Sequence, residues 1–500
     1  MTWGGLELLI GVPLVAAVAV MVLPRDGLLA GRVAVLATSV VLVGSVWAWS
    51  DVRTDAEGFR WESTGEWIEA LGVSWHLGVD ALSAPLVVLT ALLTWCCTIA
   101  LVRRAPTVGA DRSPHGLTAL VLVIEAGAIG TFVALDTLVF FVFFELVLIP
   151  MWFVVADWGD PHDVPGRRQA ATRFLVVTVT GSALMLLGFL LIRGEVGSFD
   201  LVAALEAGGS IGHGTQVTIA LLLMVGLGAK APVWPLHFWL PDAHSKAPTV
   251  GSVLLAGVLL KLGTYGLLRF WYGVVPDGAV EVAPYLGALG VVGIVYGALA
   301  CLAQTDLKRL IAYSSIGHMG FVLLAGSTMT EQGLLGANFA NVAHGLITGL
   351  LFFVVGGIKD RIGSSDFAAM GRALYARGPK LGAVLGLAAM ASLGLPGLAG
   401  FWGEMLALLA AFDPHPDLAR TTYLVLMAVA GVGVVLTTAY FVVMIRRVCQ
   451  GVSEADAVTD IQADEWVAWS PLLALTLVLG VAPGLMLWSA AESVAGVALR

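Results

Sequence analysis

Six ionisable side chains stand inside long apolar stretches of the sequence. They occur in FFVFFELVLIP, GLGAKAPVW, AGVLLKLGTYG, SSIGHMGF, NVAHGLITG and GFWGEML, and the residues are Glu145, Lys230, Lys261, His318, His344 and Glu404. An ionisable residue at the centre of a lipid bilayer costs about 2.5–3.5 kcal/mol on insertion scales, so each needs a reason. Carboxylate, amine and imidazole groups in one row can relay protons through intervening water, and their charges couple strongly at low dielectric constant. The six residues therefore predict a protonic row across the membrane plane.

Some of these residues have an alternative, structural interpretation. His318 and His344 could be core histidines that hydrogen-bond between helices, and Glu404 could cap backbone amides exposed by a nearby break. The other three have no polar neighbour in the local sequence that could shield them, which favours a functional role. His237 follows Lys230 by seven residues, or two helical turns, but two prolines intervene, so its membership of the row stays open.

Other polar residues carry a weaker signal. Asp242 and His244 in LPDAHSKAP are expected in a loop, where they cap the next helix or contact a partner. Asp80 and Asp136 begin apolar stretches, and a carboxylate at that position favours a helix N-terminus. Glu125 either faces the interior of the bundle or bonds to a neighbouring helix.

The composition defines the elements that must position these residues. Hydrophobic residues make up 58% of the 500-residue chain and charged residues 12%, whereas soluble domains have about 25% charged residues. A water-soluble globule is excluded, and an all-α polytopic membrane protein is expected. The formal charge of −9 lies in short loops, and no basic face suggests nucleic-acid binding. The four cysteines form no C-x-x-C pair, so we expect them to be packing residues rather than cluster or zinc ligands.

Apolar windows of about 20 residues predict about fourteen transmembrane helices. Their approximate ranges are 5–24, 29–49, 78–102, 115–135, 137–156, 170–192, 215–239, 248–271, 282–302, 305–326, 334–357, 381–411, 421–445 and 468–490. Most Lys and Arg residues fall in alternate loops, which the positive-inside rule assigns to the cytoplasm. They include Arg167, Arg168, Lys308, Arg309, Lys359, Arg361, Arg446 and Arg447. Both termini are therefore expected outside the cell and Arg269 in an outer loop. Lys230 and Lys261 are expected to be the only buried basic residues.

Helices 7 and 12 of this series are expected to be broken. Pro232 and Pro235 follow Lys230, and Pro396 lies among glycines in SLGLPGLAGFWGE. The breaks are five helices apart, so helices 4–8 and 9–13 would be inverted repeats; kinks at unrelated prolines are the alternative. The expected divisions are residues 1–110 for helices 1–3, 111–273 for the first repeat, 274–450 for the second repeat and 451–500 for the C-terminal helix.

Four segments resemble the M-type, antiporter-like chains of proton-pumping NADH:quinone oxidoreductase, or respiratory complex I. They are FFELVLIPMWF, KAPVWPLHFWLPDAHSKAPTVGSVLLAGVLLKLGTYGLLRF, DLKRLIAYSSIGHMGFVLL and LPGLAGFWGE, and the resemblance covers helices 4–13. The L-type and N-type chains and the sodium/proton antiporters share the Glu-Lys-Lys core. L-type chains and the antiporters differ around DAHSKAPTVGS and SIGHMG, and N-type chains usually carry Lys where Glu404 stands.

The resemblance implies an antiporter-like fold of fourteen helices, with the six residues on its central axis and His237 matching a family histidine. It also implies that this chain binds no cofactor, and that FMN, iron–sulfur clusters and quinone belong to other subunits. The expected partners are other membrane subunits of complex I, especially the L-type and N-type ones, in a bacterial plasma membrane. A proton-translocating subunit is the leading hypothesis; a subunit of a cation/proton antiporter and a non-pumping structural subunit are the alternatives.

Overall fold

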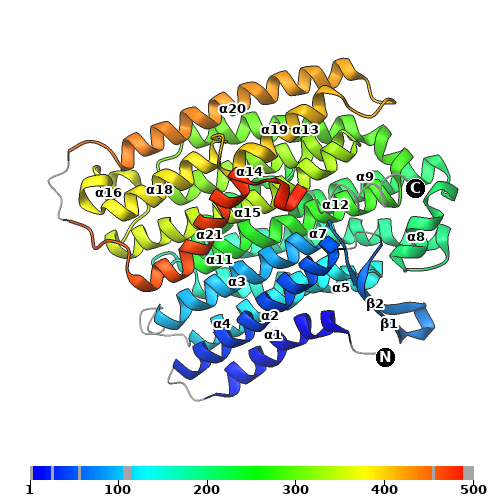
Figure 1. Cartoon of the computed structure of the whole chain (residues 1–500), viewed down its shortest axis with the longest axis horizontal. Coiled ribbons are helices and arrows are strands. Elements are labelled where there is room, and N and C mark those ends of the chain that lie inside the picture. Colours follow the sequence, from blue (N-terminus) through cyan, green and yellow to red (C-terminus); the bar gives the residue numbers. More distant parts are fainter. Residues whose placement is uncertain (1–3, 24–27, 55–57, 105–113, 453–456, 488–500) are drawn as a thin grey trace.

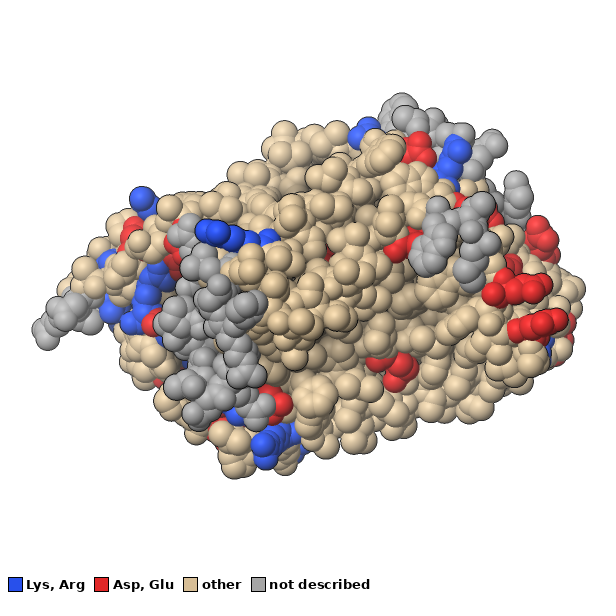
Figure 2. Space-filling view, turned by 90° about the horizontal axis from the view of Figure 1, so that it is seen from below, with Lys and Arg blue, Asp and Glu red and all other residues tan. Residues whose placement is uncertain are grey.

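Nearly all long helices run along the long axis of the molecule (Figure 1). The computed structural model describes residues 4–23, 28–54, 58–104, 114–452 and 457–487. Twelve helical segments of this part are long and apolar enough to cross a membrane. In Figure 2 most visible Lys and Arg side chains lie toward one end, most visible Asp and Glu toward the other, and a largely uncharged band separates them. The expected all-α polytopic membrane fold is confirmed.

The N-terminal part contains a β-hairpin that the sequence analysis did not predict. The antiparallel strands β1 and β2 connect the second and third long helices at one end of the molecule. The elements are α1 (Gly5–Val22), α2 (Leu28–Thr54), β1 (Arg60–Ile68), η1 (Glu69–Leu71), β2 (Val73–Val79) and α3 (Ala84–Arg104). Alternation in RWESTGEWI was the available signal, but the search for apolar windows passed over it.

The first repeat forms the next section of the bundle. Its helices are α4 (Pro114–Val133), α5 (Thr137–Leu146), α6 (Leu148–Trp158), α7 (Val164–Val196), α8 (Leu201–Ala207), η2 (Gly208–Ser210), α9 (His213–Lys230), η3 (Leu236–Trp239), α10 (Leu240–Lys246), α11 (Thr249–Leu254), η4 (Leu255–Leu259) and α12 (Leu260–Gly273). α5 and α6 together make one candidate span. α11, η4 and α12 make another, in which η4 is a π-helical turn.

The second repeat continues to the far side of the bundle, where α20 lies (Figure 1). Its helices are α13 (Pro276–Leu302), α14 (Leu307–Ser327), α15 (Glu331–Ile362), α16 (Phe367–Met370), α17 (Leu374–Arg377), α18 (Pro379–Ser392), α19 (Ala399–Phe412) and α20 (Arg420–Val448). The last helix, α21 (Ala463–Val481), returns to the middle and packs against α3, α15 and α19. The four cysteines are buried and free.

Both expected breaks are present. The predicted helix 215–239 is α9, which ends at Lys230 before the two prolines, and the predicted helix 381–411 is α18 and α19, separated by residues 393–398. Proline removes a backbone donor and clashes with the preceding turn, which explains why neither helix continues. α9 and the α18–α19 pair are the elements that the sequence analysis counted in addition to the twelve candidate spans.

The two repeats carry the same backbone feature, an isolated β-bridge between two N-cap aspartates, at opposite ends of the molecule. Asp136, the N-cap of α5, forms an isolated β-bridge with Asp200, the N-cap of α8. Asp306, the N-cap of α14, forms the equivalent bridge with Asp366, the N-cap of α16. α8 and α16 lie at opposite ends in Figure 1. The inverted arrangement is therefore visible in the backbone, and the expected capping role of Asp136 is confirmed.

Candidate functional site

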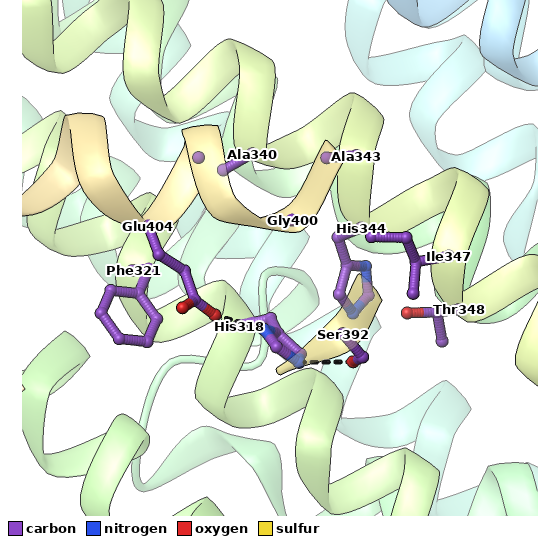
Figure 3. A pocket seen from close by; sticks show the side chains of 11 residues that line it. His318, Phe321, Ala340, Ala343, His344, Ile347, Thr348, Ser392, Gly400 and Glu404 are labelled. Atoms are coloured by element: carbon purple, nitrogen blue, oxygen red, sulfur yellow. Dashed lines mark hydrogen bonds and ion pairs between the residues drawn. The ribbon is translucent and has the colours of Figure 1, made fainter. Parts of the chain in front are cut away.

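The break between α18 and α19 brings a histidine, a serine and a carboxylate together (Figure 3). His318 of α14 has its Nδ1 3.3 Å from Oε1 of Glu404, and its Nε2 2.9 Å from Oγ of Ser392. Ser392 is the last residue of α18 and Glu404 lies in the second turn of α19. Among the described backbone amides none donates to Glu404, so its position favours the imidazole contact over a cap.

A small cavity joins this group to the next histidine. It is lined by His318, His344, Ser392, Glu404 and apolar residues of α15 and α19, and has a volume of about 20 Å³. This volume exceeds the roughly 10–15 Å³ that one water molecule needs. Three of the lining residues can donate or accept protons, so a water in the cavity would have polar partners.

The π-helical turn η4 positions Lys261 against His344. Nζ of Lys261 lies 2.5 Å from Nδ1 of His344 and 2.5 Å from the carbonyl oxygen of Ala256 within η4. A nitrogen–nitrogen hydrogen bond needs one lone pair, so Lys261 and His344 hold one shared proton between them in this contact. The rings of His344 and His318 have centroids 5.6 Å apart. Lys261, His344, His318 and Glu404 therefore form one continuous group, the central cluster.

Lys230 and Glu145 form a separate group on α9 and α5. Nζ of Lys230 donates to the carbonyl oxygen of Phe144 at 3.0 Å and lies 3.8 Å from the centroid of the Phe144 ring. Glu145 is close enough for its charge to act on Lys230, although the two form no ion pair within 4.0 Å in the described part of the chain. One carboxylate oxygen of Glu145 is buried without a hydrogen-bond partner among described atoms.

The helices that carry Lys230 and Lys261, α9 and α12, pack directly against each other. A Cβ atom on Gly263 of α12 would lie 2.6 Å from the carbonyl oxygen of Leu227 and 2.7 Å from the amide nitrogen of Ala231, both in or next to α9. Only glycine allows this approach. Lys230 and Lys261 thus lie on touching helices, without a direct side-chain contact among the described residues.

His237 is placed differently from the other six. It lies in η3, and its ring packs 4.8 Å from that of Tyr296 on α13. Its Nδ1 is buried without a partner among described atoms. The structure brings it close to none of the residues of the central cluster by a hydrogen bond or ring contact.

The chain resembles known proteins over nearly its whole length. The family described as NADH:quinone oxidoreductase/Mrp antiporter, TM matches residues 134–432, the part that holds both groups. The chain belongs to this family. Subunit M of NADH-quinone oxidoreductase from Rhodobacter capsulatus is 37% identical over 500 residues, with 96% of this chain and 94% of that protein covered.

Two solved structures match this family member over nearly its whole length. A chain of respiratory complex I from Thermus thermophilus with bound NADH has a TM-score of 0.87 and 27% identity, with 99% of each chain covered. A chain of the Mrp complex from Dietzia sp. DQ12-45-1b has a TM-score of 0.85 and 22% identity, covering 99% of this chain and 98% of that one. The second likeness shows the fold alone.

The expected loop position of Asp242 and His244 is wrong for this family member. Both lie in α10, because Pro241 falls in the first turn of that helix, where proline is tolerated. Asp242 pairs with Arg173 at 2.8 Å and with Arg309 at 3.4 Å. His244 is fully buried and its ring is stacked 4.7 Å from that of Phe352.

The expectation that Lys230 and Lys261 are the only buried basic residues is also wrong. Lys308 is buried and donates to the carbonyl oxygen of Ala247 at 2.5 Å. Arg269 is buried in α12, with Nη2 2.6 Å from Oδ1 of Asp80. Both had been assigned to loops because they stand near the ends of apolar windows, where sequence boundaries are least certain.

Asp80 and Glu125 are two further buried acidic residues. The same oxygen of Asp80 accepts the amide of Ser83 at 3.0 Å, so the expected capping role is present together with the ion pair. Glu125 is fully buried in α4, and neither of its carboxylate oxygens has a hydrogen-bond partner among the described residues. Of the two alternatives for Glu125, its burial agrees with a position facing the interior of the bundle, and the hydrogen bond to a neighbouring helix is not formed among the described residues.

Proposed function

We propose that this chain is an M-type, proton-translocating membrane subunit of NADH:quinone oxidoreductase. The observation that carries the proposal is the central cluster, in which Lys261, His344 and Glu404 are buried and His318 is mostly buried. The four residues are joined by contacts and lie beside a cavity at a helix break. Its protons would move in response to redox chemistry in other subunits. The chain would thus take part in the enzyme without holding its redox site.

The contacts suggest an order of proton movement. Glu145 holds the proton of Lys230 by its charge, and neutralising Glu145 favours release of that proton. When Lys261 passes its proton to Nδ1 of His344, the imidazole releases the proton on its other ring nitrogen, Nε2, which has no partner among the described atoms. Water in the cavity can carry it to His318, whose Nδ1 faces the carboxylate of Glu404. When the proton reaches Glu404, the Lys261 amine and the Glu404 carboxyl are both neutral, so the two buried charges of opposite sign are lost together.

The direct test is Lys261→Ala in the assembled complex, reconstituted in vesicles with NADH and a quinone. We expect proton pumping to be lost, because His344 then has no partner with which to share a proton. Thr94→Val is a matched control, since the Thr94 hydroxyl is buried but bonds only to the carbonyl of Thr90 in its own helix. Wild-type pumping by assembled Lys261→Ala complex would refute the proposal.

We infer that cofactors and most partners lie elsewhere in the complex. FMN, iron–sulfur clusters and quinone would be held by other subunits, and the neighbours in the membrane would be the L-type and N-type subunits. The purified chain is therefore expected to contain neither iron nor flavin in stoichiometric amounts. Metal analysis and an absorption spectrum test this, and either centre at one per chain would contradict it.

We also propose that the chain lies in a bacterial plasma membrane with the α16–α18 end in the cytoplasm. Basic residues gather at that end in Figure 2, which agrees with the positive-inside rule. A cysteine introduced between Lys359 and Lys380 should escape a membrane-impermeant reagent in intact cells, and clear labelling would reverse the orientation. The termini, expected outside, lie beyond the described residues, as does the expected boundary at residues 110 and 111.

The fold match to the Mrp complex keeps one second candidate, a subunit of a cation/proton antiporter. Vesicles containing the complex separate the two functions. An antiporter exchanges sodium for protons when a pH gradient is imposed without NADH, whereas the proposed subunit pumps only during NADH oxidation. A purely structural subunit would leave the buried ionisable residues as an unexplained cost.

A further inference from the structure

A second line of polar contacts leaves the Lys261–His344 pair toward the hairpin end of the molecule. α12 and α15 run antiparallel here: three residues beyond Lys261, the hydroxyl of Thr264 donates to Oδ1 of Asn341 at 2.9 Å. Asn341 is in turn three residues before His344. Residues three or four apart share one helix face, so the polar contact between the two helices continues past the pair.

α15 continues this line with a second asparagine. Asn338, Asn341 and His344 follow one another at intervals of three residues on the same side of the helix. Asn338 is 1% exposed, and neither atom of its side-chain amide has a hydrogen-bond partner among the described residues. Nδ2 of Asn341 and Nε2 of His344 are unpartnered in the same way. Buried amides are costly unless hydrogen-bonded, and water, which donates and accepts, is the partner that fits them.

α12 carries a matching line of larger side chains. Lys261, Tyr265 and Arg269 are spaced by four residues, which places them along one face. The hydroxyl of Tyr265 accepts from Nε of Arg269 at 3.2 Å, and Nη2 of Arg269 pairs with Asp80 at 2.6 Å. Nη1 of Arg269 is buried without a partner among described atoms. Asp80 directly follows β2, so this line ends at the hairpin.

We propose that these residues form a second outlet for protons from the Lys261–His344 pair, one that bypasses Glu404. Water held by Asn341 and Asn338 carries the proton outward, while the amides themselves keep their protonation state. The Asp80 carboxylate accepts the proton when Arg269 moves aside, and then releases it to water at the hairpin end. Asp80 and Arg269 thus act as a gate that opens only when their ion pair is broken. This outlet rests on the proposed function.

The asparagines separate this proposal from a merely structural interpretation. The Asp80–Arg269 pair also anchors the start of α3 to α12, so its removal would disturb the fold as well as an outlet. The amide of Asn338, in contrast, makes no hydrogen bond to the described protein. Replacing it by leucine, of nearly the same size, removes the site for water and costs no protein contact.

The test is Asn338→Leu in the complete complex, in the wild-type background and together with Glu404→Gln. We expect Asn338→Leu alone to lower the number of protons pumped per NADH, and to remove what pumping remains in Glu404→Gln. Asn338→Ser, whose hydroxyl can still hold water, should restore pumping in both backgrounds. Thr94→Val serves as the matched control, and the amount of assembled complex is measured in each case.

Three results would overturn the outlet. The first is wild-type pumping by Asn338→Leu with no further loss in the Glu404→Gln background. The second is an equal loss in Asn338→Ser, because the effect would then not depend on a group that holds water. The third is normal pumping by Lys261→Ala, which would refute the proposed function as well. A loss in Lys261→Ala with none in the asparagine variants would refute the outlet alone.

Discussion

The two inverted repeats share a broken helix, but the ionisable residue at the break is a base in one repeat and an acid in the other. In the first repeat, α9 ends at Lys230, a cation whose Nζ is held by a backbone carbonyl and an aromatic ring. In the second, the broken helix carries Glu404, an acid that faces His318 across a contact of 3.3 Å beside a cavity. The cation is enclosed by Phe144, whereas the acid borders space for water.

The difference shows how a symmetric backbone can support a directional process. A helix break frees backbone groups in both repeats, and these must be satisfied by protein or water. In the first break, Nζ of Lys230 donates to a backbone carbonyl oxygen, so this break offers a single proton site enclosed by protein. With a carboxylate beside a histidine, the second break offers two groups between which a proton can move. We therefore propose that the first repeat loads protons and the second releases them.

The largest expected effect comes from Lys230→Ala. It leaves the partly buried carboxylate of Glu145 without its nearby cation. One oxygen of that carboxylate already has no hydrogen-bond partner among the described atoms, so its charge becomes uncompensated. We expect pumping to fail and, through tight coupling, NADH:quinone turnover to fall, while the complex still assembles. Glu145→Gln should give the same result. Proton uptake and NADH oxidation are measured on the same vesicles. Normal pumping by assembled mutant complex would refute a role of the first repeat in loading protons.

Replacing Glu404 has the next largest effect and tests release. Glu404→Gln removes the proton site, whereas Glu404→Asp keeps the acid but shortens its reach. We expect Gln to lose most of the pumping and Asp to retain a reduced level in equally assembled complexes. If Glu404 were only a cap, Gln would pump normally, because an amide oxygen still accepts hydrogen bonds. Equal pumping by wild type and Glu404→Gln would therefore decide against a proton site.

Sequence reasoning located the ionisable row because charges inside apolar windows are conspicuous. It could not say which of them meet. The contact of Lys261 with His344 depends on the π-helical turn before Lys261, and nothing in LAGVL marks a π-helix. Likewise, the pairing of His318 with Glu404 depends on how α14 packs against α19, which is a tertiary property.

The residues whose positions were predicted wrongly from the sequence have a different reason in common. Arg269 and Lys308 stand near helix ends, where a basic residue in a loop and a buried one have the same local sequence. His244 lies between prolines, which indicate a loop but also suit the first turn of a helix. The β-hairpin was not predicted because its strands contain many polar residues and therefore form no apolar window. Expected family motifs covered helices 4–13 and gave no signal for the N-terminal part.

A smaller effect is expected when Asp136 or Asp306, the N-cap residues that form the two β-bridges, is replaced. Comparing the two replacements tests whether the bridges stabilise both repeats equally. Asp136 caps α5 and also accepts the amide and hydroxyl of Ser74 in the hairpin, at 3.0 and 3.3 Å. Asp306 caps α14 and accepts the hydroxyl of Ser365. Losing an N-cap costs about 0.5–2 kcal/mol. We expect Asp136→Ala to lower the thermal stability of the complex more than Asp306→Ala, because it also releases the hairpin; the reverse order would contradict this.

The smallest expected effect is a pH-dependent stability near the Asp136–Asp200 bridge that the Asp306–Asp366 bridge lacks. Nδ1 of His76 in β2 lies 2.5 Å from Asp200, and Nε2 lies 2.8 Å from Glu62 in β1. Burial lowers the pKa of His76, but the hydrogen bonds and charges of Asp200 and Glu62 outweigh it, so the pKa is raised above 6.5. A raised pKa in the folded state stabilises the hairpin fully below the unfolded value and ceases to do so as the pH rises through the folded value.

Hydrogen–deuterium exchange at a series of pH values, corrected for intrinsic rates, measures this dependence. Protection of β1 and β2 should fall as the pH rises above about 6.5, the ordinary value for histidine, and His76→Gln should abolish the pH dependence. The second repeat supplies an internal control, because the partner of Asp306 is the serine hydroxyl of Ser365, which does not titrate in this range. The start of α14 should therefore keep constant protection over the same series. Parallel loss of protection at both bridges would mean that His76 is not the titrating group and that the repeats respond alike.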